Sequence, residues 1–130
     1  MRVAIVHPSP QGVTTGNRVT ALRWAKLLRE LGHDVRVRTK LDDAPVDVLI
    51  ALNARKCAQV VLDCRVRHPR AKRVTAVTGT DLYEPLSGLP AATTALDASH
   101  AIVALAQNAL ERLPQHLRSR ARVLLQSAPT

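Results

Sequence analysis

Short apolar segments that alternate with amphipathic ones are the feature that most constrains the fold of this chain. The apolar segments cover residues 3–7, 46–52, 73–78, 100–105 and 122–127. Short runs rich in β-branched residues are typical of strands that are buried on both faces of a sheet. Residues 34–39 instead alternate between polar and apolar side chains. That alternation predicts a half-exposed strand at the edge of the sheet.

Segments with helical spacing lie between these strands. In residues 17–31 the apolar side chains recur every three or four positions, and Gly32 follows where a helix commonly ends. A second helix is predicted over residues 54–67, because the His68-Pro69 pair that follows disfavours a longer one. Shorter helices are predicted over residues 91–98 and 106–113.

Strands that alternate with helices of about 10–15 residues indicate right-handed βαβ units. The sequence therefore predicts an α/β fold, with a Rossmann-like, doubly wound parallel sheet and helices on both of its faces. At 130 residues, the chain has the length of a single domain of this kind. Such sheets bind ligands beyond the carboxyl ends of their strands. Functional residues are therefore expected in the loops that follow the strands.

Composition and spacing disfavour a membrane protein and a metal site. No apolar run approaches the roughly 20 residues that span a bilayer, and the first residues lack the long apolar region of a secretion signal. We expect a cytoplasmic protein without a membrane partner. Cys57 and Cys64 are seven positions apart, which on a helix is about 10 Å and too far for a disulfide. With no zinc-ligand spacing beside them, buried thiols and no metal are expected.

The chain carries 19 Lys and Arg against 10 Asp and Glu, a formal net charge of +9. This balance favours an anionic partner without identifying it. Nucleic acid is disfavoured, because one Trp and one Tyr leave little for base stacking and no helix-turn-helix or RNP pattern is present. The densest basic cluster, residues 65–73, is interpreted as a solvated surface at the edge of the sheet opposite the expected ligand.

The loop after the first strand contains Gly12 and Gly16, separated by three residues and followed by Asn17 and Arg18. It matches neither the G-x-G-x-x-G pattern of dinucleotide-binding folds nor the G-x-x-x-x-G-K-[ST] pattern of P-loops. Gly16 would still let backbone N–H groups approach a ligand at the positive end of the helix, where Arg18 could contact an anion. The alternative is a plain connection in which Asn17 caps the helix.

Two later loops also carry candidate residues. In TGTDLY, residues 78–83, Gly79 permits a sharp turn after the fourth strand. Thr80 and Asp81 could hold sugar hydroxyls or position a nucleophile; alternatively, Asp81 forms an Asx turn that caps the next helix. Arg55 follows the third strand at the start of a predicted helix, where a positive charge opposes the helix dipole. That position favours a contact with an anionic ligand.

Four runs of residues together resemble the N-terminal half of the two-domain (GT-B) glycosyltransferases of family 4. They are GNRVTALRWAKLLRELGHDV, DVLIALNARK, TGTDLY and RVLLQSA. Within that group the chain is similar to the selenosugar synthases of selenoneine biosynthesis. The specific parts of the resemblance are residues 16–31 and 78–83, and the likeness extends over essentially the whole chain.

The resemblance implies a glycosyltransferase that joins selenophosphate to the anomeric carbon of a UDP-sugar, UDP-N-acetylglucosamine, with release of UDP. No cofactor or essential metal is implied. In this architecture the N-terminal domain holds the acceptor and the C-terminal domain holds the nucleotide sugar. The chain is therefore expected to be the acceptor-side domain, without its C-terminal partner and inactive alone. An apolar surface left by that partner could also support a homodimer.

Site residues follow from the same resemblance. Gly16, Asn17 and Arg18 would face the cleft near the phosphates, and Arg55 would help to bind the anionic acceptor. The predicted catalytic residues, near the reacting centre, are Thr80 and Asp81. The predicted substrate-binding residues are Gly12, Gly16, Asn17, Arg18, Arg55, Gly79 and Tyr83. The residues leave one alternative open, a stand-alone Rossmann-like module that binds a phosphorylated ligand or a protein partner without catalysis.

Overall fold

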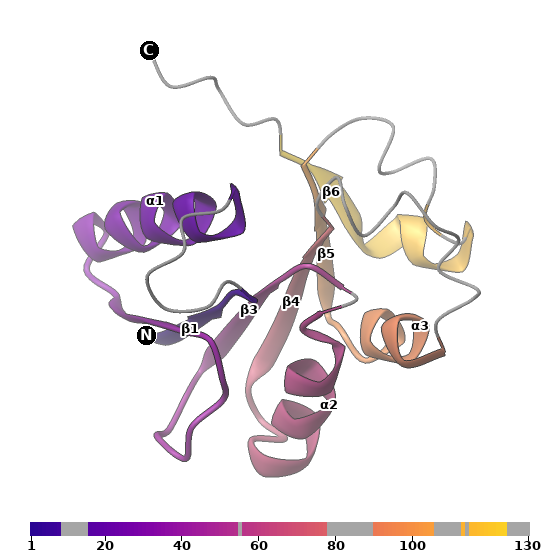
Figure 1. Ribbon diagram of the computed structural model, residues 1–130, viewed down its shortest axis with the longest axis horizontal. Coiled ribbons are helices and arrows are strands. Elements are labelled where there is room, and N and C mark those ends of the chain that lie inside the picture. Colours follow the sequence, from indigo (N-terminus) through magenta and orange to yellow (C-terminus); the bar gives the residue numbers. More distant parts are fainter. Residues whose placement is uncertain (9–15, 55, 78–89, 106–112, 114, 125–130) are drawn as a thin grey trace.

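The computed structural model describes residues 1–8, 16–54, 56–77, 90–105, 113 and 115–124. Within these residues, six parallel strands form one sheet in the order β2-β1-β3-β4-β5-β6. The strands are β1 (Arg2–Val6), β2 (Asp34–Arg38), β3 (Val48–Leu52), β4 (Lys72–Val77), β5 (Ala101–Ala104) and β6 (Ala121–Val123). The helices are α1 (Gly16–Glu30), α2 (Ala58–Arg67), α3 (Pro90–Asp97) and the 3-10 helix η3 (Gln115–Arg120). The fold is α/β and Rossmann-like, as the sequence predicts (Figure 1).

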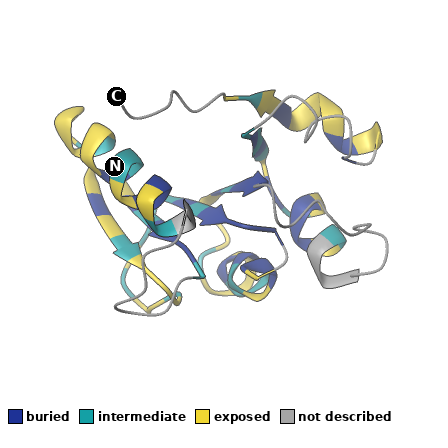
Figure 2. Cartoon of the chain, turned by 45° about the horizontal axis from the view of Figure 1, so that its top comes forward, coloured by how far each residue is buried: buried dark blue, intermediate teal, exposed yellow. Residues whose placement is uncertain are grey.

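The helices cover both faces of the sheet, which confirms the doubly wound arrangement. α1 packs on one face, where Ala21 and Ala25 share a buried cluster with Ile5 of β1. α2, α3 and η3 pack on the other face, where Val61 of α2 shares a buried cluster with Leu49 of β3. Figure 2 shows the buried residues concentrated in the strands and on the inner sides of the helices. This division follows because successive side chains of a strand point to opposite faces.

Gly32 ends α1 in the way its position predicts. The Gly32 N–H donates to the Arg29 carbonyl at 3.0 Å, and the His33 N–H donates to the Leu28 carbonyl at 3.1 Å. These two bonds make a Schellman motif, which needs a left-handed residue, and Gly32 has a φ of +94°. Glycine adopts that conformation without a Cβ clash. The turn leads directly into β2.

β2 is an edge strand, as its alternating pattern predicts. The Asp34 N–H donates to the Met1 carbonyl, and the Arg38 carbonyl accepts from the His7 N–H, both at 3.0 Å. Even-numbered residues of β2 therefore bond to β1, and the backbone groups of Val35 and Val37 face outward.

Arginines cap the outward carbonyls of this edge. Arg29 donates from Nη2 to the Val35 oxygen at 2.8 Å, and Arg38 donates from Nη1 to the Val37 oxygen at 3.1 Å. An exposed row of backbone acceptors is a template for pairing with another strand. The two guanidinium groups occupy those acceptors and so disfavour edge-to-edge association.

Some element boundaries differ from the prediction. α2 begins at Ala58 rather than at residue 54. Asn53 has a φ of +90°, and the chain turns before it reaches Cys57, the N-cap residue that precedes the helix. The strand predicted over residues 46–52 begins at Val48, and the last strand covers 121–123. η3 was not predicted, because its sequence QHLRSR is polar apart from the buried Leu117. Most of the helix predicted over residues 106–113 lies outside the described residues.

Candidate functional site

The carboxyl ends of β1 and β3 form the topological switch point of the sheet. β1 continues into α1 on one face, and the neighbouring strand β3 continues into α2 on the opposite face (Figure 1). Open α/β sheets bind their ligands in the crevice at this point. The described residues here include His7 after β1, Asn53 after β3, and the first turn of α1.

His7 is a buried histidine at the end of β1, with 5% of its surface exposed. Its backbone N–H donates to the Arg38 carbonyl at 3.0 Å, which holds the residue in line with the sheet. Burial, and to a lesser degree the positive charge of Arg18, lowers the pKa of the His7 imidazole below its ordinary value of 6.5. Burial therefore favours the neutral ring, in which one nitrogen donates a hydrogen bond and the other accepts one.

Arg18 lies in the first turn of α1 and is half-buried. No acidic residue stands in that turn. A cation at the amino end of a helix is disfavoured by the helix dipole. A bound anion at the same place would be stabilised by both the guanidinium and the dipole. Arg18 is predicted from the sequence as a contact for such an anion, and in the structure its charge acts on the His7 imidazole.

Asn53 has a backbone conformation that is unusual for a residue other than glycine, with a φ of +90° and 1% of its surface exposed. Its N–H donates to the Ala76 carbonyl at 3.0 Å, and its own carbonyl accepts from the Cys57 N–H at 3.0 Å. Its side-chain Oδ1 accepts the Lys56 N–H at 3.1 Å. Asn53 therefore shapes the turn from β3 to α2. Left-handed residues that the surrounding structure enforces cluster at functional sites.

Both cysteines are buried free thiols. Cys57 lies at the start of α2, with its Sγ 3.1 Å from the Leu52 carbonyl oxygen and 3.9 Å from that of Val6. It therefore packs under the switch point between the ends of β3 and β1. Cys64 lies deeper along α2, where burial raises the pKa of its thiol.

The predicted site residues are described only in part. Gly16, Asn17 and Arg18 form the first turn of α1, so Asn17 lies within the helix rather than before it as a cap. The remaining predicted residues lie outside the described residues: Gly12, Arg55, Gly79, Thr80, Asp81 and Tyr83. Sequence reasoning did not select His7 and Asn53. A signal was present, since each directly follows an apolar strand on one side of the switch point.

The opposite edge of the sheet carries the basic cluster of residues 65–73. Its members Arg65, Arg67, Arg70 and Lys72 are exposed, which confirms the interpretation as a solvated surface. Arg73 is the exception, with 8% of its surface exposed. It donates from Nε to the Ala98 carbonyl at 2.7 Å, just beyond the end of α3. This arginine therefore stabilises the carboxyl end of a helix.

Comparison of the sequence with protein-family profiles gives no match, and comparison with curated proteins gives none either. In the described part of the chain, no three His, Cys, Asp or Glu residues are grouped so that they could hold a metal ion. None of the helices described here is long and apolar enough to cross a membrane.

Proposed function

We propose that this chain is the acceptor-side domain of a glycosyltransferase-like selenosugar synthase. The observation that carries the proposal is the position of Arg18 in the first turn of α1, beside the buried His7 at the switch point where an α/β sheet binds its ligand. The resemblance of four sequence runs supplies the reaction class. The net charge of +9 agrees with an anionic acceptor.

Selenophosphate has the chemistry that this arrangement would hold. The Arg18 guanidinium can donate paired hydrogen bonds to phosphate oxygens, and the amino end of α1 adds positive potential. The selenium would attack the anomeric carbon of the UDP-sugar. The C–Se bond forms as the bond from that carbon to the UDP oxygen breaks, and UDP leaves. His7 would donate a hydrogen bond to the acceptor or accept one at its other ring nitrogen.

The roles of the donor sugar and of the other predicted site residues are those that the resemblance implies. UDP-N-acetylglucosamine would bind mainly to a C-terminal domain, in a cleft that both domains form. Thr80 and Asp81 would act near the reacting centre, and Arg55 would contact the acceptor. Acceptor binding is thus the property for which this chain is tested directly.

Isothermal titration calorimetry with selenophosphate, and with inorganic phosphate as its stable analogue, tests the acceptor site. Arg18→Ala is expected to weaken binding by about tenfold or more, since a charge-assisted hydrogen bond contributes about 1.5–3 kcal/mol. Lys26→Ala is the matched control, because it removes one positive charge from an exposed position of the same helix. Equal losses in the two variants would show that only net charge attracts the anion and would contradict the site.

A second measurement separates an enzyme from a binding module without catalysis. The chain is combined with a donor-binding C-terminal domain, selenophosphate and UDP-N-acetylglucosamine, and the products are analysed by mass spectrometry. A sugar with a C–Se bond, formed together with UDP and lost in Asp81→Ala, is the expected result. Phosphate binding without any such product would favour the binding module.

A further inference from the structure

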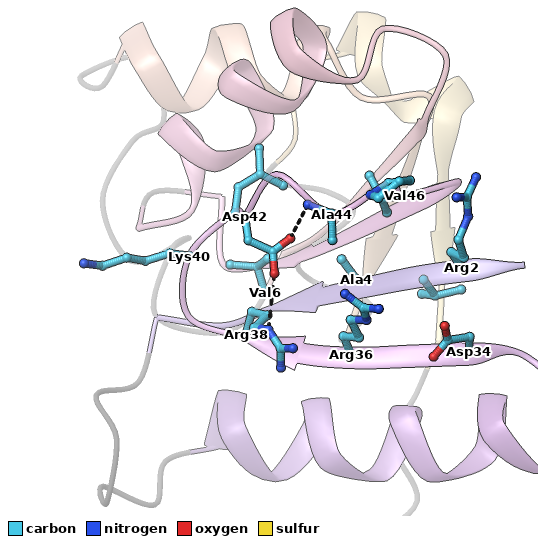
Figure 3. Close-up of a pocket in the computed structure, with 13 residues that line it drawn as sticks. Arg2, Ala4, Val6, Asp34, Arg36, Arg38, Lys40, Asp42, Ala44 and Val46 are labelled. Carbon is cyan, nitrogen blue, oxygen red and sulfur yellow. Dashed lines mark hydrogen bonds and ion pairs between the residues drawn. The ribbon is translucent and has the colours of Figure 1, made fainter.

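The connection from β2 to β3 crosses the sheet without a helix. Residues 39–47 run over the face that carries α2, from the carboxyl end of β2 to the amino end of β3 (Figure 3). Leu41 and Val46 of this connection pack against the buried cluster that contains Val6. In doubly wound sheets, helices ordinarily cover both faces. The loop is thinner than a helix and leaves a hollow over β1 and β2.

The hollow is apolar inside and charged around its rim. Ala4 and Val6 of β1 form its floor, and Leu41, Pro45 and Val46 of the loop line its side. The charged residues that line it are Arg2, Asp34, Arg36, Arg38, Lys40 and Asp42. Four of these six are cations, so the rim favours an anionic ligand.

The carboxylates at this rim already interact with cations. Asp42 Oδ2 lies 3.5 Å from Arg38 Nε, and its Oδ1 accepts the Ala44 N–H at 3.0 Å. At the other end of the hollow, Arg2 bonds to Asp47 at 3.2 Å. Hydrogen bonding to Asp47, with a smaller contribution from the charge of Asp34, raises the pKa of Arg2.

Arg36 differs from these residues. It lies on β2 in register with Ala4, and Figure 3 shows its guanidinium above the floor of the hollow. No carboxylate of the described residues lies within ion-pair distance of Arg36. Lys40 lies at the rim and extends away from the floor (Figure 3). Arg36 is therefore the cation with donors available to a ligand in the hollow.

We propose that the hollow binds a small organic oxyanion, a carboxylate or phosphate group on a short apolar skeleton. Arg36 would hold the anionic group, because a guanidinium presents paired N–H donors that match either oxyanion. The apolar skeleton would lie on the partly exposed Ala4, where it displaces water from apolar surface. Neither His7 nor Arg18 lines the hollow, so this ligand is separate from the acceptor at the switch point.

A backbone-amide NMR titration of the whole chain tests this proposal, with butyrate, butyl phosphate and inorganic phosphate as probes. Saturable shifts are expected in β1, β2 and residues 41–46, with butyl phosphate binding more tightly than inorganic phosphate. Arg36→Gln is expected to weaken butyl phosphate binding at these residues about tenfold, through loss of a charge-assisted pair. Arg36→Lys keeps the charge without the paired donors and is expected to bind with intermediate affinity.

Arg122→Gln is the matched control, since Arg122 is an exposed strand arginine on β6, at the far edge of the sheet. It is expected to leave the affinity unchanged. Thermal unfolding of each variant checks the fold, and Arg36→Lys serves as the test if Arg36→Gln does not fold. Equal weakening by Arg36→Gln and Arg122→Gln, or saturable shifts confined to the switch point, would overturn the proposal. An absence of saturable shifts in the hollow would do the same.

Discussion

The left-handed backbone of Asn53 leads to a prediction in which glycine is better tolerated than alanine. At a φ of +90°, an L-alanine loses about 1 kcal/mol relative to glycine. Both substitutions also remove the Oδ1 acceptor of the Lys56 N–H, which costs about 1 kcal/mol. We therefore expect Asn53→Ala to lower the free energy of unfolding by about 2 kcal/mol and Asn53→Gly by about 1 kcal/mol.

Urea unfolding followed by circular dichroism measures these differences. The matched pair is Gln59→Ala and Gln59→Gly, because Gln59 is exposed within α2 and has ordinary helical geometry. There the order should reverse, with glycine less stable than alanine by about 1 kcal/mol. The same order at both positions, with alanine more stable than glycine at residue 53, would refute the argument that this turn requires a left-handed residue.

Three further perturbations test other parts of the structure. Arg29→Met removes the donors to the Val35 carbonyl and is expected to increase self-association in sedimentation velocity, whereas Lys26→Met is not; equal behaviour would contradict edge capping. Desolvation, together with the charge of Arg18 on His7 and of Arg73 on His100, lowers the pKa values of both histidines below 6.5, so the unfolded state binds more protons in acid. The unfolding free energy should be constant above about pH 7.5 and fall as pH drops through 6.5, and the fall should be smaller in His7→Gln. An unfolding free energy that does not change with pH in urea titrations would contradict this. Arg73→Met leaves the Ala98 and Ala71 carbonyls without their donor and should cost about 1–3 kcal/mol in thermal unfolding, against less than about 0.5 kcal/mol for the exposed Arg70→Met.

The fold could be predicted from the sequence because its main signals are local. Apolar runs marked five of the six strands, and the alternation in residues 34–39 marked the sixth, the edge strand β2. Gly32 marked the end of α1 through its left-handed conformation. The start of α2 was wrong by four residues. Asn53 turns the chain through backbone bonds to β4 and α2, and such tertiary contacts leave no periodic pattern in the sequence.

The candidate site was predictable only in outline. Arg18 could be selected because it follows a glycine loop at the amino end of a predicted helix, where a bound anion is favoured. His7 was missed although it stands at the end of the first apolar run, because the burial and the nearby charge of Arg18 that lower its pKa arise from tertiary structure. The hollow at Arg36 could not be predicted either. It depends on a nine-residue loop standing where a crossover helix would otherwise cover the sheet, and the sequence pattern does not show which face a loop crosses.

The arginines of this protein also change how its net charge of +9 is interpreted. Arg29 and Arg38 donate to carbonyls of the edge strand, Arg73 and Arg120 donate to carbonyls around the end of α3, and Arg118 donates to the Leu113 carbonyl. A guanidinium can satisfy a backbone acceptor without a carboxylate beside it. Much of the excess positive charge therefore accompanies structural caps and does not require a polyanionic partner. Arg18 and Arg36 stand apart from this group by position. One lies at the ligand edge of the sheet and the other lies over an apolar hollow, so these two arginines are where an anionic ligand is to be sought.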